Sequence, residues 1–425
     1  MSTRVVLKRV EDEQRLRDRL TVVLEDKTTR VCFVDGVWPT FSVPFSAVPT
    51  TSGNNRSYRP CLSFPRFTGT LRPEQVNIYQ NARIKLAETH VVMISCFPGF
   101  GKTITTLSLV CSLHLRAIIV CHRVCLVQQW RESIATFCSA DAVVVDLPGY
   151  TGTDYHFGII NIANVHKLND IPVDHVLVTD ETHLLLSEKR SLNLLKFCPK
   201  RFIGLTATPY RPDELHVLFK FFYGENFIVK KLFKKHDIYT VYTGIVMLER
   251  RIYGKLDWNY MLEQQATNVQ RHRLLIDIIQ TFPADRTWLV LVKRVAHGEA
   301  LRDLLSTVRP SRVVSLLTGN VHTYDKQCDI LIGTVGKIGT GFDFPKLDSL
   351  LVAADMVQYY IQFLGRVMRT KNVPVVVDVV DQHAIMNLHY LSRKKEYIEH
   401  GGRIINANER VRDLTTITTT CANPP

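Results

Sequence analysis

The sequence has no uncharged apolar stretch near the length of about 18 residues that a membrane-spanning helix requires. Its N-terminus, MSTRVVLKRVEDEQ, is charged where a secretory signal peptide would be apolar. The ten cysteines show no repeated C-x-x-C spacing, which excludes the common zinc-finger and disulfide-framework patterns. We therefore expect an intracellular protein of a reducing compartment, either nucleus or cytoplasm, with no membrane partner.

The overall composition is that of a globular chain with an excess of positive charge. Of 425 residues, 46% are hydrophobic and 22% charged, which suits two or three domains. The formal net charge of +13 favours a polyanionic partner, and nucleic acid is the usual one. An ordinary basic protein that binds no nucleic acid would have the same net charge, so the sequence motifs are needed to distinguish the two.

Short apolar runs alternate with helical segments through most of the chain. This alternation is typical of parallel sheets covered by helices on both faces. The runs lie at 91–96, 117–121, 142–146, 158–163, 175–180 and 201–207, and again at 287–292, 312–317, 329–334, 349–354 and 373–380. The basic and aromatic stretch 211–265 between the two sets predicts an interdomain segment.

The predicted architecture is α/β with two such domains in tandem. Residues 1–67, with β-branched runs and a loop rich in Pro, Ser and Gly, predict a small accessory domain and linker. The first sheet domain is predicted at 68–228 and the second at 229–410. A tail at 411–425 completes the chain.

An apolar run, a glycine-rich turn and a helical stretch follow one another from Val91. This order predicts a phosphate cradle, because backbone N–H groups and the positive end of the helix dipole face the anion. The turn consists of Phe97, Pro98, Gly99, Phe100, Gly101, Lys102 and Thr103. Lys102 is expected to reach the β- and γ-phosphates, and Thr103 to hold Mg²⁺. Cys96 replaces the first glycine of the strict G-x-x-x-x-G-K-[ST] pattern, and we expect ATP binding to survive; a chance turn is the alternative.

The apolar run HVLVT leads into an acidic pair. Ligand chemistry in α/β proteins gathers where strands end. Asp180 is expected to help hold Mg²⁺, and Glu181 to orient and activate the attacking water. His183 is expected to link the ATP site to the neighbouring domain. A solvated acidic loop is the alternative, but the position downstream of the phosphate-binding turn favours catalysis.

The second half of the chain contains the arginine-rich segment QFLGRVMR, residues 362–369. Phosphoryl transfer builds negative charge, which arginines from outside the phosphate-binding domain stabilise. Arg366 and Arg369 are three residues apart, so on a helix they would share a face and point at one triphosphate. The alternative is a basic helix that contacts nucleic acid or solvent.

In this order, the segments resemble the motifs of superfamily 2 DExH-box helicases and translocases, over residues 70–370. The nearest branch contains XPB, the phage UvsW protein and the poxvirus transcript-release helicase, and the compact length suits a large DNA virus. The resemblance implies two RecA-like domains that close around one ATP.

The resemblance also assigns roles to further residues. Gln75, in LRPEQ, would read the adenine base. Thr206 and Thr208, in GLTATP, would couple ATP state to strand contact together with Gln362. In TVGKIGTGFDFP, Gly341 would allow close backbone approach and Asp343 would sit near the nucleotide.

The expected nucleic-acid contacts are Arg123 and Gln128 in the segment 120–130, and Arg211 after GLTATP. Where Cys121-His122-Arg123 stands, the resemblance leads us to expect a proline. A basic cluster with nearby aromatics either contacts and stacks on nucleic acid or forms core; it consists of Lys230, Lys231, Lys234 and Lys235 with Phe219, Phe221, Phe222, Tyr223 and Phe233. Residues 393–395 predict a solvated basic face.

The sequence thus predicts an ATP-dependent motor, a DNA helicase or translocase that couples hydrolysis to strand unwinding or remodelling. ATP and Mg²⁺ are the expected cofactors. DNA is favoured over RNA, with transcription or repair proteins as further candidate partners. Two alternatives stay open: an RNA helicase or ribonucleoprotein remodeller, and a nucleic-acid-binding assembly subunit that does not hydrolyse ATP.

Overall fold

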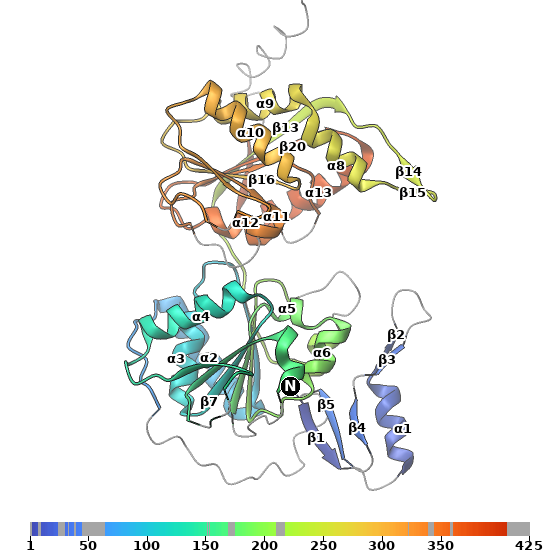
Figure 1. Cartoon of the computed structure of the whole chain (residues 1–425), viewed down its shortest axis with the longest axis vertical. Coiled ribbons are helices and arrows are strands. Elements are labelled where there is room, and N and C mark those ends of the chain that lie inside the picture. The colour runs from blue at the N-terminus through green and yellow to red at the C-terminus, as the bar shows by residue number, and fades with distance from the viewer. Residues whose placement is uncertain are drawn as a thin grey trace, which may run out of the picture. The chain divides into compact units, whose positions relative to one another are not determined.

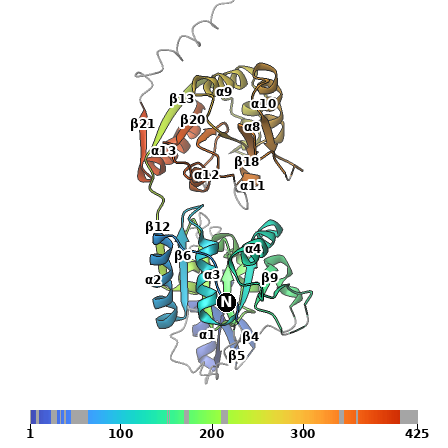
Figure 2. The same ribbon diagram turned by 90° about the vertical axis from the view of Figure 1, so that its left-hand side faces the viewer.

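The computed structural model divides into two compact units, Met1–Lys231 and Leu232–Pro425 (Figures 1 and 2). Each unit is built on a seven-stranded sheet in which every neighbouring pair of strands is parallel. The structure describes residues 2–6, 10–23, 30–32, 34–37, 40–44, 64–150, 152, 154–168, 175–209, 217–321, 323–338, 344–357 and 360–405.

The N-terminal part of the first unit is a small α/β element. An antiparallel sheet runs in the order β1-β5-β4, and β2 pairs with β3. Its apolar residues Leu20, Val34 and Val43 are buried, and Phe221 of the same unit packs against them. The elements are β1 (Ser2–Val6), α1 (Val10–Arg19), β2 (Thr21–Val23), β3 (Arg30–Cys32), β4 (Asp35–Val37) and β5 (Thr40–Pro44).

The first parallel sheet has the order β12-β6-β11-β10-β7-β9-β8. Its central strands are apolar along their whole length because both faces are covered. In β6, Val92 and Ile94 enter one core cluster while Val91 and Met93 enter the other. The strands are β6 (Val91–Cys96), β7 (Arg116–Cys121), β8 (Val144–Asp146), β9 (Phe157–Asn161), β10 (His175–Thr179), β11 (Arg201–Thr206) and β12 (Phe227–Lys230).

Helices cover both faces of this sheet (Figure 1). The first cluster takes residues from α2 (Pro73–Thr89), α3 (Lys102–Leu113) and α4 (Val124–Phe137). The second takes residues from the 3-10 helix η1 (Ile162–Lys167), α5 (Thr182–Leu185), α6 (Glu188–Leu194) and α7 (Val217–Tyr223). The sheet is therefore the middle of three layers.

The second parallel sheet has the order β17-β18-β16-β19-β20-β13-β21. Its strands are β13 (His236–Val246), β16 (Trp288–Val292), β17 (Val314–Leu317), β18 (Ile330–Thr334), β19 (Ser349–Val352), β20 (Val375–Gln382) and β21 (Gly402–Ile405). A two-stranded hairpin, β14 (Arg251–Ile252) and β15 (Lys255–Leu256), projects from this unit (Figure 1).

Six helices accompany the second sheet in the part of the chain that the structure describes. They are α8 (Trp258–Thr267), α9 (Val269–Thr281), α10 (Val295–Val308), α11 (Val335–Ile338), α12 (Tyr360–Val367) and α13 (Ala384–Glu399). Leu275 and Ile279 of α9 and Leu301 of α10 are buried against β16 and β18. Their spacing gives each helix the apolar stripe that a covering helix needs.

The prediction of an interdomain segment at 211–265 is wrong for its described part. Helix α7 and strand β12 complete the first unit, whereas β13 is a strand of the second sheet. Of the five aromatics of the predicted cluster, Phe219, Phe222 and Tyr223 are buried, Phe221 is half-buried and Phe233 is strongly exposed. The core alternative is thus confirmed for those three, because apolar rings of α7 fill the space beneath the first sheet.

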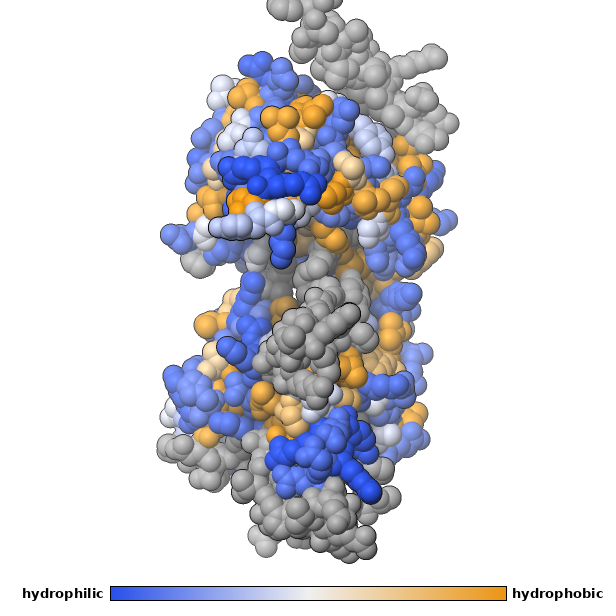
Figure 3. All heavy atoms as spheres, turned by 90° about the vertical axis from the view of Figure 1, so that its right-hand side faces the viewer, coloured by the Kyte–Doolittle hydropathy of each residue, from blue (hydrophilic) through white to orange (hydrophobic). Residues whose placement is uncertain are grey.

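The surface mixes apolar and hydrophilic side chains over both units, as Figure 3 shows for one face. Tyr253, at the turn of the β14–β15 hairpin, is fully exposed. Among the described helices, none has the length and hydropathy needed to cross a membrane.

Gly204 in β11 tests how tightly the first sheet packs on α7. A Cβ built on Gly204 would lie 2.5 Å from Cζ of the buried Tyr223 ring. We predict that Gly204→Ala destabilises the protein by about 1–3 kcal/mol through overpacking, seen as a lower Tm. Gly336→Ala is the control, since nothing lies within 4 Å of its Cβ. Equal Tm values for the two variants would contradict the prediction.

Candidate ATPase site

Three predicted motifs meet at one edge of the first sheet because their strands are parallel neighbours. Strand β11 lies between β6 and β10. Thr206 at the end of β11 pairs with Ser95 of β6, and Thr179 at the end of β10 pairs with Gly204. The glycine-rich turn, the acidic pair and the GLTATP segment therefore leave the sheet side by side, at the edge where α/β proteins bind ligands.

The glycine-rich turn has its glycines where the backbone requires them. Gly99 and Gly101 have φ values of 83° and 90°, in the left-handed region that favours glycine. Cys96 is the last residue of β6, buried and outside that region. Replacing the first glycine by Cys96 thus strains no backbone. Helix α3 begins at Lys102, whose ammonium donates to the Cys96 carbonyl at 2.9 Å.

Gln75 connects this turn to α2. Its Oε1 accepts from the backbone N–H of Arg72 at 2.8 Å, and its Nε2 donates to the Phe100 carbonyl at 3.0 Å. The Arg72 guanidinium donates to the same carbonyl. A Cβ on Gly101 would overlap the Gln75 amide, so the glycine is needed for this contact. Gln75 therefore supports the turn, and its reading of adenine stays a prediction.

The acidic pair is held in a buried, polar environment. Asp180 is 8% exposed, and its Oδ2 accepts from the Trp130 indole at 3.0 Å. Burial, followed by the charge of Glu181, raises the pKa of Asp180 from 3.8 to about 6. Glu181 has a φ of 49°, and its buried Oε2 accepts no hydrogen bond. The two carboxylates lie close together, and positive charge does not balance both of them. This arrangement favours a bound cation and a polar substrate.

His183 links the acidic pair to the GLTATP segment. Its Nδ1 lies 2.9 Å from Thr206 Oγ1 and 3.5 Å from Glu181 Oε2. Thr206 Oγ1 in turn donates to the Thr208 carbonyl and accepts from the Thr208 N–H, both at 3.0 Å. Glu181, His183, Thr206 and Thr208 thus form one continuous polar chain, mostly buried.

A metal at this site would need ligands beyond side-chain carboxylates. No group of three His, Cys, Asp or Glu side chains suited to a metal occurs among the described residues. Mg²⁺ prefers one or two carboxylates together with phosphates and water. Asp180, with its raised pKa, and the Thr103 hydroxyl are the side chains proposed to hold it.

In the second unit, the arginine segment differs from the expectation in one respect. Helix α12 ends at Val367, so Arg369 lies in the following turn and the two arginines do not share a helical face. Gln362 is buried, whereas Arg366 and Arg369 are half-buried. Lys234, one of the candidate nucleic-acid contacts, donates to the carbonyls of Met368 and Thr370 and holds this turn.

The other predicted residues are only partly described. Arg123 and Gln128 are exposed, Arg123 just before α4 and Gln128 within it. Arg211, Gly341 and Asp343 lie outside the described residues. Lys230 makes an ion pair with Glu74 at 3.7 Å.

Comparison with known proteins identifies the family. The type III restriction enzyme res subunit family matches residues 68–211. The chain is 39% identical over 380 residues to putative helicase 161L of Invertebrate iridescent virus 6, covering 83% of this chain and 86% of the viral protein. This chain is a superfamily 2 helicase.

Further similarities agree with the expected branch and fold. The helicase is 25% identical over 337 residues to transcript termination protein A18 of Yaba monkey tumor virus, with 68% and 66% of the two chains covered. It is 28% identical over 170 residues to the DNA 3'-5' translocase XPB2 of Sulfurisphaera tokodaii, with 37% and 38% covered. S. cerevisiae Dbp5 bound to RNA and ADP BeF3 superposes with a TM-score of 0.55 at 14% identity, covering 81% and 97%. The RecA-like fold is confirmed.

The helicase also uses residues that sequence reasoning missed. Trp130 lies at the end of the predicted strand-contacting segment 120–130, yet its indole N–H donates to the carboxylate of Asp180. Thr182 is buried and accepts from the Leu205 N–H at 3.2 Å, joining the acidic segment to β11. Nothing in their spacing signals these contacts, because they span 50 and 23 residues.

The raised pKa of Asp180 predicts a pH-dependent loss of stability. The folded helicase holds this proton more tightly than the unfolded chain, so ionisation between pH 3.8 and about 6 costs the folded state about 2–3 kcal/mol. We expect the Tm of Asp180→Asn, relative to the unmutated helicase, to rise as pH increases from 4 to 7.5. A Tm difference that is constant across this range would show that Asp180 titrates normally.

Proposed function

We propose that this helicase hydrolyses ATP with Mg²⁺ and uses the energy to move along DNA, unwinding or remodelling it. The observation that carries the proposal is the meeting of the Lys102 turn, the Asp180–Glu181 pair and Thr206 at one sheet edge. A P-loop lysine beside two acidic residues is the arrangement that nucleoside triphosphate hydrolysis needs.

The first unit is proposed to supply binding and water activation. The turn from Pro98 to Thr103 cradles the phosphates, with Lys102 moving from the Cys96 carbonyl to the triphosphate. Asp180 and Thr103 would hold Mg²⁺, which would supply positive charge against the phosphates. Glu181 orients the attacking water, and its buried Oε2, which accepts no hydrogen bond, supports that role.

The second unit is proposed to complete catalysis with Arg366 and Arg369. Their charge offsets the negative charge that develops on the transferred phosphoryl group. Gly341 and Asp343 are proposed to approach the nucleotide, and Gln362 to respond to it. Hydrolysis then requires both units, which is how one ATP can drive movement.

The chain from Glu181 through His183 to Thr206 and Thr208 is proposed to couple ATP state to nucleic acid. A shift of Glu181 on hydrolysis changes its 3.5 Å contact with His183, and the shared Thr206 hydroxyl passes this to the GLTATP segment. Arg123, Gln128 and Arg211 are the proposed strand contacts, because cations and amides suit backbone recognition, and Arg123 and Gln128 are exposed.

DNA is the proposed partner. The XPB2 relative is named a DNA translocase, and the net charge of +13 suits any polyanion. We further propose a reducing cellular compartment, since the ten cysteines do not have the spacing of a disulfide framework.

The proposal is tested by measuring phosphate release from the full chain with double-stranded DNA, single-stranded DNA, RNA or none of them. DNA is expected to stimulate turnover. Stronger stimulation by RNA would select the ribonucleoprotein remodeller. Tight ATP binding without turnover would select the non-hydrolysing subunit, and turnover that no nucleic acid stimulates would overturn the motor itself.

Glu181→Gln is predicted to lower DNA-stimulated kcat by at least about 10²-fold while ATP still binds, because only the water-activating carboxylate is lost. Lys102→Ala should weaken ATP binding as well. Glu225→Gln, at an exposed ion pair with Lys220, is the matched control and should leave kcat unchanged. A near-normal rate for Glu181→Gln would assign water activation to another group.

A further inference from the structure

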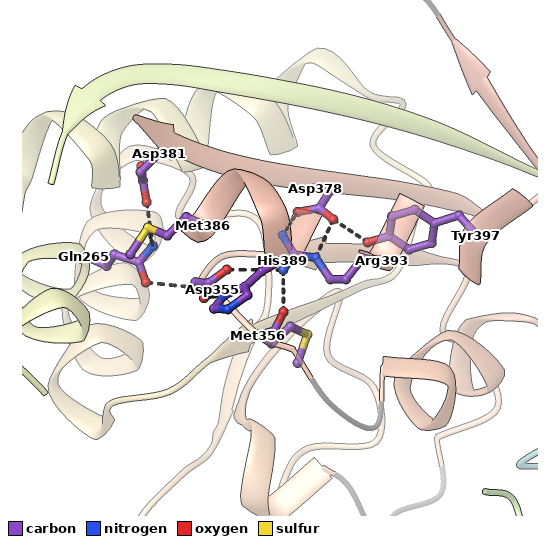
Figure 4. A network of polar contacts seen from close by, with 9 residues as sticks. All are labelled: Gln265, Asp355, Met356, Asp378, Asp381, Met386, His389, Arg393 and Tyr397. Atoms are coloured by element: carbon purple, nitrogen blue, oxygen red, sulfur yellow. Dashed lines mark hydrogen bonds and ion pairs between the residues drawn. The ribbon is translucent and has the colours of Figure 1, made fainter. Parts of the chain in front are cut away.

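A buried polar network surrounds the segment that leads from β19 into α12. Residues 353–356 follow the end of β19, and α12 carries Gln362 and Arg366. Figure 4 shows side chains from α8 and α13 that contact Asp355 and Met356 and are themselves bound by Asp378 and Asp381 of β20. These side chains come from elements that contribute nothing to the motif itself.

Asp355 is the centre of these contacts. Its carboxylate, 4% exposed, accepts from His389 Nδ1 at 2.6 Å and from Arg393 Nη1 at 3.2 Å. Its backbone N–H donates to Gln265 Oε1 at 3.1 Å. Both the side chain and the main chain of this residue are therefore fixed from outside the segment.

Arg393 joins this segment to β20. Sequence analysis assigned it to a solvated face, which is wrong: it is 2% exposed and forms a two-point ion pair with Asp378 of β20, both bonds at 2.8 Å. Its Nη1 also donates to the Met356 carbonyl. A planar guanidinium can hold several acceptors at once, which an ammonium cannot do with the same geometry.

A second arginine fixes the start of the segment. Arg271 of α9, fully buried, donates to the Ala353 carbonyl at 2.6 Å and pairs with Asp381 of β20 at 3.0 Å. Gln265 joins the two halves, because its Nε2 donates to Asp381 at 2.5 Å while its Oε1 accepts from Asp355.

Buried ion pairs of this kind are a poor means of stabilising a fold. Removing two charges from water costs several kcal/mol each, and apolar replacements often serve stability equally well. What they supply is geometric constraint. Here both arginines contact a carboxylate of β20 with one part of the guanidinium and a backbone carbonyl of residues 353–356 with another.

We propose that Arg271, Gln265, His389 and Arg393 form a clamp on residues 353–356 that positions α12, so that Arg366 is held ready for the triphosphate. This inference rests on the proposed ATPase function. Asp355 is a positioning residue that acts through Arg366. Lys234 restrains the other end, since its contacts lie in the turn directly after α12.

Asp355→Asn is the test, in the full chain. It keeps the backbone contact with Gln265 and the Arg393–Asp378 pair but removes the charge that binds Arg393 and His389. A misplaced catalytic group costs up to about 10²-fold, so we expect kcat to fall at least about tenfold. The affinity for ADP with aluminium fluoride should fall by the same factor, and the affinity for ADP alone should not change.

Tyr397→Phe is the matched control. The Tyr397 hydroxyl donates to Asp378 at 2.6 Å, so it acts in the same network on the β20 side of Arg393. It should lower Tm as Asp355→Asn does and leave kcat within about twofold. His389→Ala, at a half-buried side chain, is the second test variant should Asp355→Asn not fold, and a smaller loss of kcat with unchanged ADP affinity is expected.

Equal losses of kcat in Asp355→Asn, or in His389→Ala, and in Tyr397→Phe would overturn the clamp and leave a purely structural network. Arg366→Ala separates this from failure of the proposed function. If Arg366→Ala lowers kcat and the clamp variants do not, only the clamp is wrong. If the unmutated helicase shows no DNA-stimulated turnover, the proposed function is wrong.

Discussion

The arrangement of the ATPase site depends on the parallel register of β6, β11 and β10. Parallel strands end at a common edge, so three segments from positions 96, 179 and 206 emerge as neighbours without any contact between their loops being needed. Side chains on both faces of these strands are packed in the two core clusters, and that close packing holds the register. Each loop then needs only local support.

That support comes from buried polar side chains that bind loop backbone. Gln75 holds the carbonyl of Phe100 in the first unit, and Arg271 and Arg393 hold those of Ala353 and Met356 in the second. In each case the side chain comes from a helix outside the motif, so the loop conformation is set before a ligand arrives. Preorganisation of this kind limits the entropy that ligand binding would otherwise cost.

The strands and the motif residues could be predicted from the sequence because both are local patterns. The apolar runs and the GKT and DETH segments are legible within a few residues, and order along the chain supplied the family. Prediction from the sequence failed where a residue's role is set by partners that are distant along the chain. Arg393 was interpreted as a solvated cation and Lys234 as a candidate nucleic-acid contact, yet their acceptors are 15 to 136 residues away. Arg369 was misplaced for a different reason, since the end of a short helix carries little signal.

The acidic pair shows why such a site cannot be judged by stability alone. Burial raises the pKa of Asp180 to about 6, so near neutral pH the ionised carboxylate weakens the fold that contains it. A fold selected only for stability would have an amide or an apolar residue there. The Trp130 indole offsets part of the cost with one hydrogen bond, while the Oε2 of Glu181 is left without any. The carboxylates of Asp180 and Glu181 thus lack positive charge and a hydrogen-bond donor at this edge of the sheet. A bound cation and a polarised water would supply them.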